Sequence, residues 1–145
     1  RSQTGHRQKL AAIVEPGDTI FIDTGSTTLI CAQALAAIDR LTVITNSVRV
    51  AQVLGKSEKN VTVYLLGGTF SHDNAETVGP LVIDQIARFQ VDHAVLIPSS
   101  VISRRVLNLL LPFIGRKWNY VRSPAAIKCS LSRRGARKLK ECQIS

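Results

Sequence analysis

One join between two kinds of sequence recurs along this chain and constrains its fold more than any other feature. An apolar run ends in a polar or glycine-rich cluster, and a helix-favouring segment follows. The run "TIFID" (residues 19–23) passes through Thr24 and Gly25 into "STTLICAQALAAI" (residues 26–38). The run "LTVIT" (residues 41–45) passes through Asn46 into "SVRVAQVLG" (residues 47–55). β-Branched runs bounded by turn residues predict strands, and Ala- and Leu-rich segments that begin with Ser or Thr predict helices.

The third join is longer, and a fourth apolar run follows it. "VTVYLLGG" (residues 61–68) ends at paired glycines, and a polar excursion separates it from the helical segment "GPLVIDQIARF" (residues 79–89). "DHAVLIP" (residues 92–98) is the fourth expected strand. The four runs are apolar throughout, as strands buried on both faces of a parallel sheet require. Strand–helix alternation then predicts an α/β fold, with right-handed crossovers and helices on both faces of a mostly parallel sheet.

In such a sheet, the loops after the strands share one edge, and helix N-termini open onto it. The segments "DTGSTT", "TNS", "LGG" and "LIPSS" should therefore gather there. Glycine at positions 25 and 67 lets the backbone approach a ligand, and free N–H groups at a helix start suit an anion. A phosphate fits this edge. Asp23 would repel it, so we assign Asp23 either to a sugar hydroxyl or to the cap of its own helix. Plain helix caps explain the Ser, Thr and Asn residues equally well.

The order and spacing of "EPGDTIFIDTGSTT", "LTVITNSVRVAQVL", "VTVYLLGGTF", "TVGPLV" and "VDHAVL" resemble the C-terminal effector domain of the DeoR family of bacterial transcriptional regulators. The match covers about residues 10–96. The resemblance implies a fold related to ribose-5-phosphate isomerase and glucosamine-6-phosphate deaminase. It also implies a cytoplasmic, self-associating sensor of phosphorylated sugars, fused behind a helix-turn-helix that binds operator DNA. No such segment precedes Arg1 in this sequence, so operator binding would belong to a domain outside it.

The same resemblance implies which residues hold the ligand. The phosphate loop would lie after the first strand, and three further segments would join it. The implied set is Asp23, Thr24, Gly25, Ser26, Thr27, Thr28, Thr45, Asn46, Ser47, Gly67, Gly68 and Gly79. We expect no cofactor and no metal, because His6, His72 and His93 are far apart and lack ligands at metal spacing. We expect reduced, packed thiols at Cys31, Cys129 and Cys142.

Charge divides the chain into two parts. Residues 1–103 hold 8 Lys and Arg against 9 Asp and Glu, a net charge of −1, whereas residues 104–145 hold 11 against 1, a net charge of +10. The family's Gly/Asp-rich loop, acidic helix and late "DHSKFG"-like motif are missing from the second part. We therefore predict an effector-binding core at 1–103 and a divergent, basic tail at 104–145. A reading frame shifted near Ser103 would abandon the pattern all at once and leave the tail poorly ordered. A one-base correction of the sequenced locus that restores the motifs would support this hypothesis, and an intact frame would end it.

Two other functions fit parts of the sequence. An isomerase or deaminase needs a carboxylate with a second acid or base, and His72, Asp73 and Glu76 are the local cluster that could supply both. We expect a mobile polar loop there and no enzyme. The basic segment "SRRGARKLK" (residues 132–140) could instead bind nucleic acid or an anionic surface, although charge runs are more often solvated.

Overall fold

The computed structural model of the chain describes residues 14–97, 100–110, 119–122 and 129–132. Its strands alternate with helices over most of the chain, as the sequence predicts. In chain order the elements are β1 (Thr19–Ile22), α2 (Ser26–Leu35), β2 (Thr42–Thr45), α3 (Val48–Gly55), β3 (Thr62–Leu65), β4 (Thr69–Ser71), β5 (Glu76–Val78), α4 (Pro80–Ile86), β6 (His93–Leu96), α5 (Val101–Leu110), β7 (Asn119–Arg122) and β8 (Cys129–Ser132).

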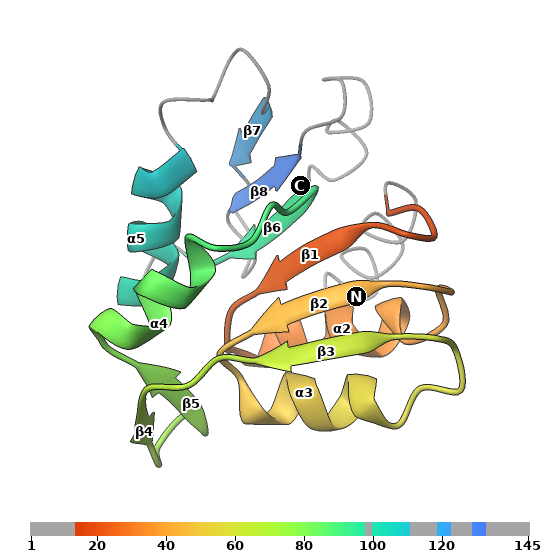
Figure 1. Cartoon of the computed structure of the whole chain (residues 1–145), viewed down its shortest axis with the longest axis horizontal. Coiled ribbons are helices and arrows are strands. Elements are labelled where there is room, and N and C mark those ends of the chain that lie inside the picture. Colours follow the sequence, from red (N-terminus) through yellow and green to blue (C-terminus); the bar gives the residue numbers. More distant parts are fainter. Residues whose placement is uncertain (1–13, 98–99, 111–118, 123–128, 133–145) are drawn as a thin grey trace.

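The main sheet has the strand order β3-β2-β1-β6-β8-β7 (Figure 1). β1 pairs in parallel with both β2 and β6, and β2 pairs in parallel with β3. β8 joins β6 in the antiparallel direction, and β7 joins β8 in the same way. The expected α/β fold with a mostly parallel sheet is therefore confirmed for the four strands that the apolar runs predict.

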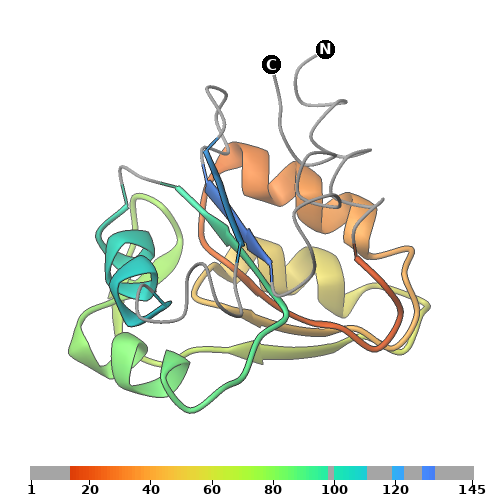
Figure 2. The same cartoon turned by 90° about the horizontal axis from the view of Figure 1, so that it is seen from above.

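Helices cover both faces of the sheet, with α2 and α3 on one side and α4 and α5 on the other (Figure 2). Successive residues of a strand point to opposite faces, so each strand contributes to two cores. Ile20 and Ile22 pack with α2 and α3, while Phe21 between them packs with α4 and α5. All three side chains are fully buried. This double burial is the reason that the runs are apolar throughout and show no alternation.

The helix starts follow local sequence signals. Ser47 is the N-cap of α3, and its hydroxyl accepts a hydrogen bond from the Val50 N–H at 3.2 Å. Pro80 occupies the first turn of α4, where its missing N–H costs nothing. Gly79 precedes it with φ +101°, a conformation that other residues rarely adopt.

The polar excursion after β3 corrects one prediction. The sequence predicts a mobile polar loop in "SHDNAET" (residues 71–77), but β4 and β5 pair as an antiparallel hairpin that includes both ends of this segment, with Ser71 opposite Glu76. Glu76 also bridges to Ser47, which ties the hairpin to the main sheet. A three-residue strand gives too short a pattern to be predicted from its sequence.

The second part of the chain contributes described elements too. α5 runs across the predicted boundary between residues 103 and 104, and β8 extends the main sheet beside β6. The division of the chain at that boundary stays a prediction, as does the shifted reading frame. No helix within the described ranges is long and apolar enough to cross a bilayer.

Candidate functional site

The four parallel strands end at one edge of the sheet. Ile22, Thr45 and Leu65 lie opposite one another at the ends of β1, β2 and β3, and Ile22 also faces Val95 near the end of β6. The hairpin β4–β5 lies at this arrowhead end of the strands (Figure 1). The segments that follow the strands, and with them the residues implied as ligand-binding, therefore start from one edge.

The start of α2 has no side-chain cap. Its N-cap is Gly25, with φ +146°, and no side chain makes a cap hydrogen bond to this helix start. The Thr28 hydroxyl instead donates to the Gly25 carbonyl at 2.9 Å. The first N–H groups of a helix have no partner within the helix. This helix start thus offers backbone donors together with the positive end of the helix dipole.

The Asp23 side chain does not cap that helix start. Its Oδ1 accepts the Thr24 N–H at 2.7 Å, and its Oδ2 accepts the hydroxyl of Ser103 from α5. Its side chain is fully buried. Of the two assignments open from the sequence, the capping of α2 by Asp23 is therefore wrong. The carboxylate instead fixes the loop between β1 and α2 and ties it to α5.

The segment "TNS" is buried and largely committed to the fold. The Thr45 hydroxyl donates to the Ile22 carbonyl at 2.6 Å and accepts the Ser47 N–H at 3.0 Å. The Asn46 amide nitrogen donates to the Thr77 carbonyl at 3.1 Å and to Glu76 Oε1 at 3.3 Å. The Asn46 carbonyl oxygen, Oδ1, is buried and has no hydrogen-bond partner. Ser47 acts as a plain helix cap, which leaves Asn46 as the member of this segment with unused hydrogen-bonding capacity.

Gly67, Gly68 and Gly79 lie near one another, and Gly68 is the one that is closely packed. The Gly67 N–H donates to Gln85 Oε1 at 3.1 Å, so this amide already has a partner. A Cβ on Gly68 would lie 2.6 Å from Val82 Cγ2 and 2.8 Å from the Val78 carbonyl oxygen. Gly79 lies beside them, since a Cβ there would be 3.9 Å from Thr69 Oγ1. The structure brings these three glycines together where β4, β5 and α4 meet.

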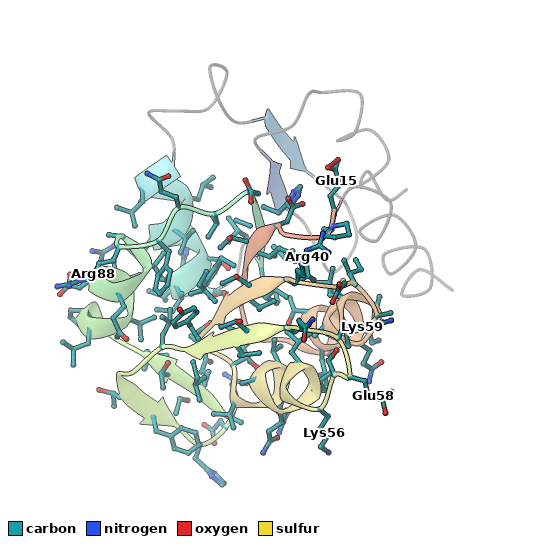
Figure 3. All side chains as sticks on the ribbon, turned by 45° about the vertical axis from the view of Figure 1, so that its right-hand side comes forward. Glu15, Arg40, Lys56, Glu58, Lys59 and Arg88 are labelled. Carbon is teal, nitrogen blue, oxygen red and sulfur yellow. The ribbon has the colours of Figure 1, made fainter. Side chains whose placement is uncertain are left out.

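Several basic side chains lie away from this edge. Arg40, Lys56 and Lys59 lie at the opposite end of the sheet, whereas Arg88, which follows α4, lies on the outer surface of the molecule (Figure 3). An anion at the start of α2 would therefore depend on backbone N–H groups and hydroxyls rather than on these four side chains.

Comparison with known proteins agrees with this architecture. The sequence model of the family described as "DeoR C terminal sensor domain" matches residues 7–107. This chain belongs to the DeoR C-terminal sensor domain family. The predicted resemblance is confirmed.

Three curated transcriptional repressors are similar in sequence to this DeoR sensor domain. The HTH-type transcriptional repressor GlcR of Bacillus subtilis (strain 168) is 36% identical over 86 residues, which are 59% of this chain and 33% of the relative. The HTH-type transcriptional repressor CsqR of Escherichia coli (strain K12) is 36% identical over 98 residues, 65% of this chain and 37% of the relative. The Glycerol-3-phosphate regulon repressor of the same strain is 32% identical over 89 residues, 61% and 35% respectively. The chain spans about a third of the length of these relatives.

Two residues of the DeoR sensor domain site escape sequence reasoning. Ser103 follows an expected strand by several residues, and nothing in its surroundings predicts that it bonds to Asp23. Glu76 was weighed only as an enzymatic acid, yet it is buried against Asn46. Burial and the nearby Asp23 carboxylate raise the pKa of Glu76 above its ordinary 4.5, while hydrogen bonds from Asn74 and Asn46 oppose that rise.

The proposed acid–base cluster is divided in the structure. His72 and Asp73 are exposed in the turn of the hairpin, whereas Glu76 is buried and faces the site. In the described parts of the chain, no three His, Cys, Asp or Glu residues gather as metal ligands. His6 and the basic residues 133–140 lie outside the described ranges.

His93 corrects a further expectation. A surface or edge position is ordinary for a histidine at a strand start, but this one is fully buried and bonds to Asp18 Oδ2 at 2.9 Å. The reason is that β6 lies inside the sheet, between β1 and β8. The expectation for Cys31 is confirmed, because this residue of α2 is fully buried in the core. Cys142 lies outside the described residues, and Cys129 belongs to β8.

Proposed function

We propose that this chain is the effector-sensing part of a cytoplasmic, non-enzymatic transcriptional regulator of the DeoR type. It binds a phosphorylated sugar or a related metabolite at the edge where β1, β2 and β3 end. Binding there changes how a DNA-binding domain outside this chain holds its operator. The family membership and the repressor names of the relatives support this proposal.

The uncapped start of α2 is the observation that carries the proposal. α3 and α2 follow neighbouring strands, and both start with hydroxyl residues nearby. Ser47 nevertheless caps α3, whereas no side chain caps α2. A phosphate satisfies several free N–H groups at once and is favoured by the helix dipole. The exposed Ser26 can add a hydroxyl donor at this position.

The hairpin β4–β5 gives such a site a route to the rest of the protein. Thr24, in the loop before α2, donates from its hydroxyl to the Asn74 carbonyl of the hairpin at 3.3 Å. A ligand that takes this hydroxyl would release that bond and change how the hairpin sits. Ligand binding can shift a conformational equilibrium only when the ligand contacts the two states differently. Thr24 supplies such a difference. Self-association, which the family resemblance implies, belongs to the same proposal.

A charge placed at the start of α2 tests the proposal. Ser26→Asp puts a carboxylate where the phosphate would lie, and an acid in the first turn stabilises a helix by about 0.3–1 kcal/mol. Without ligand, we expect the variant to unfold at the same temperature as wild type or at a higher one. We also expect it to bind glucose 6-phosphate at least about tenfold more weakly than wild type does, a loss of about 1.4 kcal/mol.

Ser26→Asn is the matched control, because it has similar size and no charge. Wild type and the control should both be stabilised by glucose 6-phosphate, by about 2.7 kcal/mol at a concentration one hundred times the dissociation constant. If Ser26→Asp binds as tightly as the control, or if wild type is not stabilised by any of a panel of phosphorylated sugars, the proposal is wrong.

A further inference from the structure

Three buried groups with hydrogen-bond acceptors meet beside the start of α2. They are the Asp23 carboxylate after β1, the Asn46 side chain after β2 and the Glu76 carboxylate at the start of β5. We call them the acceptor cluster. Asp23 and Asn46 are fully buried and Glu76 is 8% exposed. Asp23 precedes the N-cap of α2 by two residues, so the cluster adjoins the place proposed for the phosphate.

One acceptor of the cluster lacks a donor. Both Asp23 oxygens accept hydrogen bonds, from the Thr24 N–H and from the Ser103 hydroxyl. The Asn46 amide nitrogen donates to two oxygens of β5, at Glu76 and Thr77. The Asn46 carbonyl oxygen receives no hydrogen bond although it is buried. A buried acceptor without a donor is unfavourable, because it has lost water and gained nothing. The unused acceptor is therefore an independent sign that a donor belongs here.

The charges of the cluster also favour a ligand that donates hydrogen bonds. Asp23 and Asn46 directly follow Ile22 and Thr45, which pair with each other in the sheet, and Glu76 bonds to Asn46. Both carboxylates therefore neighbour Asn46, and the Asp23 charge is one cause of the raised pKa of Glu76. A hydroxyl or ammonium group that donates between them would reduce the repulsion, whereas a further carboxylate would increase it.

We propose that the acceptor cluster selects phosphate esters that carry hydroxyl or amino groups on the carbons next to the phosphate, and rejects those that carry a carboxylate there. This inference rests on the proposed function and narrows its ligand class. Glu76 is then the residue that determines specificity, since it adds the second negative charge. Asn46 Oδ1 is buried, and the amide nitrogen of the same side chain bonds to β5. The donor of the ligand reaches this oxygen when β5 moves outward, a movement that the proposed coupling through Thr24 also requires.

Two small compounds test the inference directly. Glycerol 2-phosphate and 2-phosphoglycerate both carry the phosphate on the central carbon of a three-carbon frame. They differ at one neighbouring carbon, which is a hydroxymethyl group in the first and a carboxylate in the second. Isothermal titration of wild type should show glycerol phosphate binding at least about tenfold more tightly than phosphoglycerate, which corresponds to about 1.4 kcal/mol. Inorganic phosphate carries neither group, so its affinity measures phosphate binding at the start of α2 by itself.

Glu76→Gln and Glu58→Gln separate the local effect from net charge. Both remove one negative charge, but Glu58 lies at the far end of the sheet (Figure 3). Glu76→Gln should reduce the preference to below about threefold, mainly through tighter binding of phosphoglycerate, because a like-charge repulsion is removed. Glu58→Gln should keep the wild-type preference.

The outcomes distinguish the inference from the function on which it rests. Equal affinity of wild type for the two compounds overturns the inference alone, and so does a preference that Glu76→Gln leaves unchanged. If wild type binds neither compound nor inorganic phosphate, the proposed function fails with it. The wild-type preference decides the matter even if Glu76→Gln does not fold.

Discussion

The contact between Gly68 and α4 makes a quantitative prediction about stability. In Gly68→Ala the new Cβ would lie 2.6 Å from Val82 Cγ2 and 2.8 Å from the Val78 carbonyl oxygen, whereas favourable carbon contacts lie at about 3.5–4.0 Å. Val82 is fully buried, and the other obstacle is backbone, so neither can turn aside. The hairpin or α4 must therefore shift. Such overpacking costs about 1–3 kcal/mol, which lowers the melting temperature by about 3–9 °C in a chain of this size.

Gly67→Ala is the control for this prediction, because it is the adjacent residue. The nearest atoms to a Cβ there belong to the Gln85 side chain, at 3.8 Å and 3.9 Å, which is ordinary contact. Neither glycine has a positive φ, so alanine is not strained at either position. Gly67→Ala should unfold within about 0.5 kcal/mol of wild type. Thermal and urea unfolding followed by circular dichroism measure both variants, and equal stability of the two would refute the packing argument.

Two further predictions concern single side chains. Ser47→Ala removes the cap of α3 and should lower the free energy of unfolding by about 1 kcal/mol in urea unfolding; a variant as stable as wild type would show that this hydroxyl is not needed. Because the pKa of Glu76 is raised above 4.5, the folded protein binds more protons there than the unfolded chain does, so ionisation of Glu76 destabilises the fold as the pH rises. The stability of wild type relative to Glu76→Gln should therefore fall as the pH rises from about 4.5 through the raised pKa, and then level off. Urea unfolding of both proteins across this range measures the difference, and a relative stability that stays flat or rises with pH would contradict the assignment.

The parallel sheet could be predicted from the sequence because its strands are buried on both faces. Ile20, Phe21 and Ile22 all lose their contact with water, so the apolar run is continuous and easy to recognise. The hairpin β4–β5 could not be predicted in the same way. Its strands have three residues each, and Phe70 is 57% exposed, so the segment shows no pattern of burial.

α5 has a helical signal in its sequence. Ile102 and Val106 are four residues apart and both buried, as in an amphipathic helix, and Ser100 Oγ accepts the Ser103 N–H near its start. The change of charge and the missing family motifs after Ser103 instead predict a divergent tail from residue 104. One pair of apolar residues spaced four apart is also weak evidence for a helix by itself.

The site was predictable in its location more than in its contacts. Strand ends of a parallel sheet share an edge by topology, so Gly25 and Asn46 could be assigned to it from their places in the sequence. The bonds of Asp23 to Ser103 and of Asn46 to Glu76 join residues 80 and 30 positions apart. No local pattern encodes such pairs, because they depend on how α5 and the hairpin pack against the sheet.

The most direct test of the central claim is to observe the amides at the start of α2 while a ligand is added. In nitrogen–proton correlation spectra, titration with glucose 6-phosphate should shift the amide resonances of residues 25–28 saturably, and glucose should leave them in place. If the phosphorylated sugar shifts a different region of the protein, or if glucose produces the same shifts, the start of α2 is not a phosphate site and the account is contradicted.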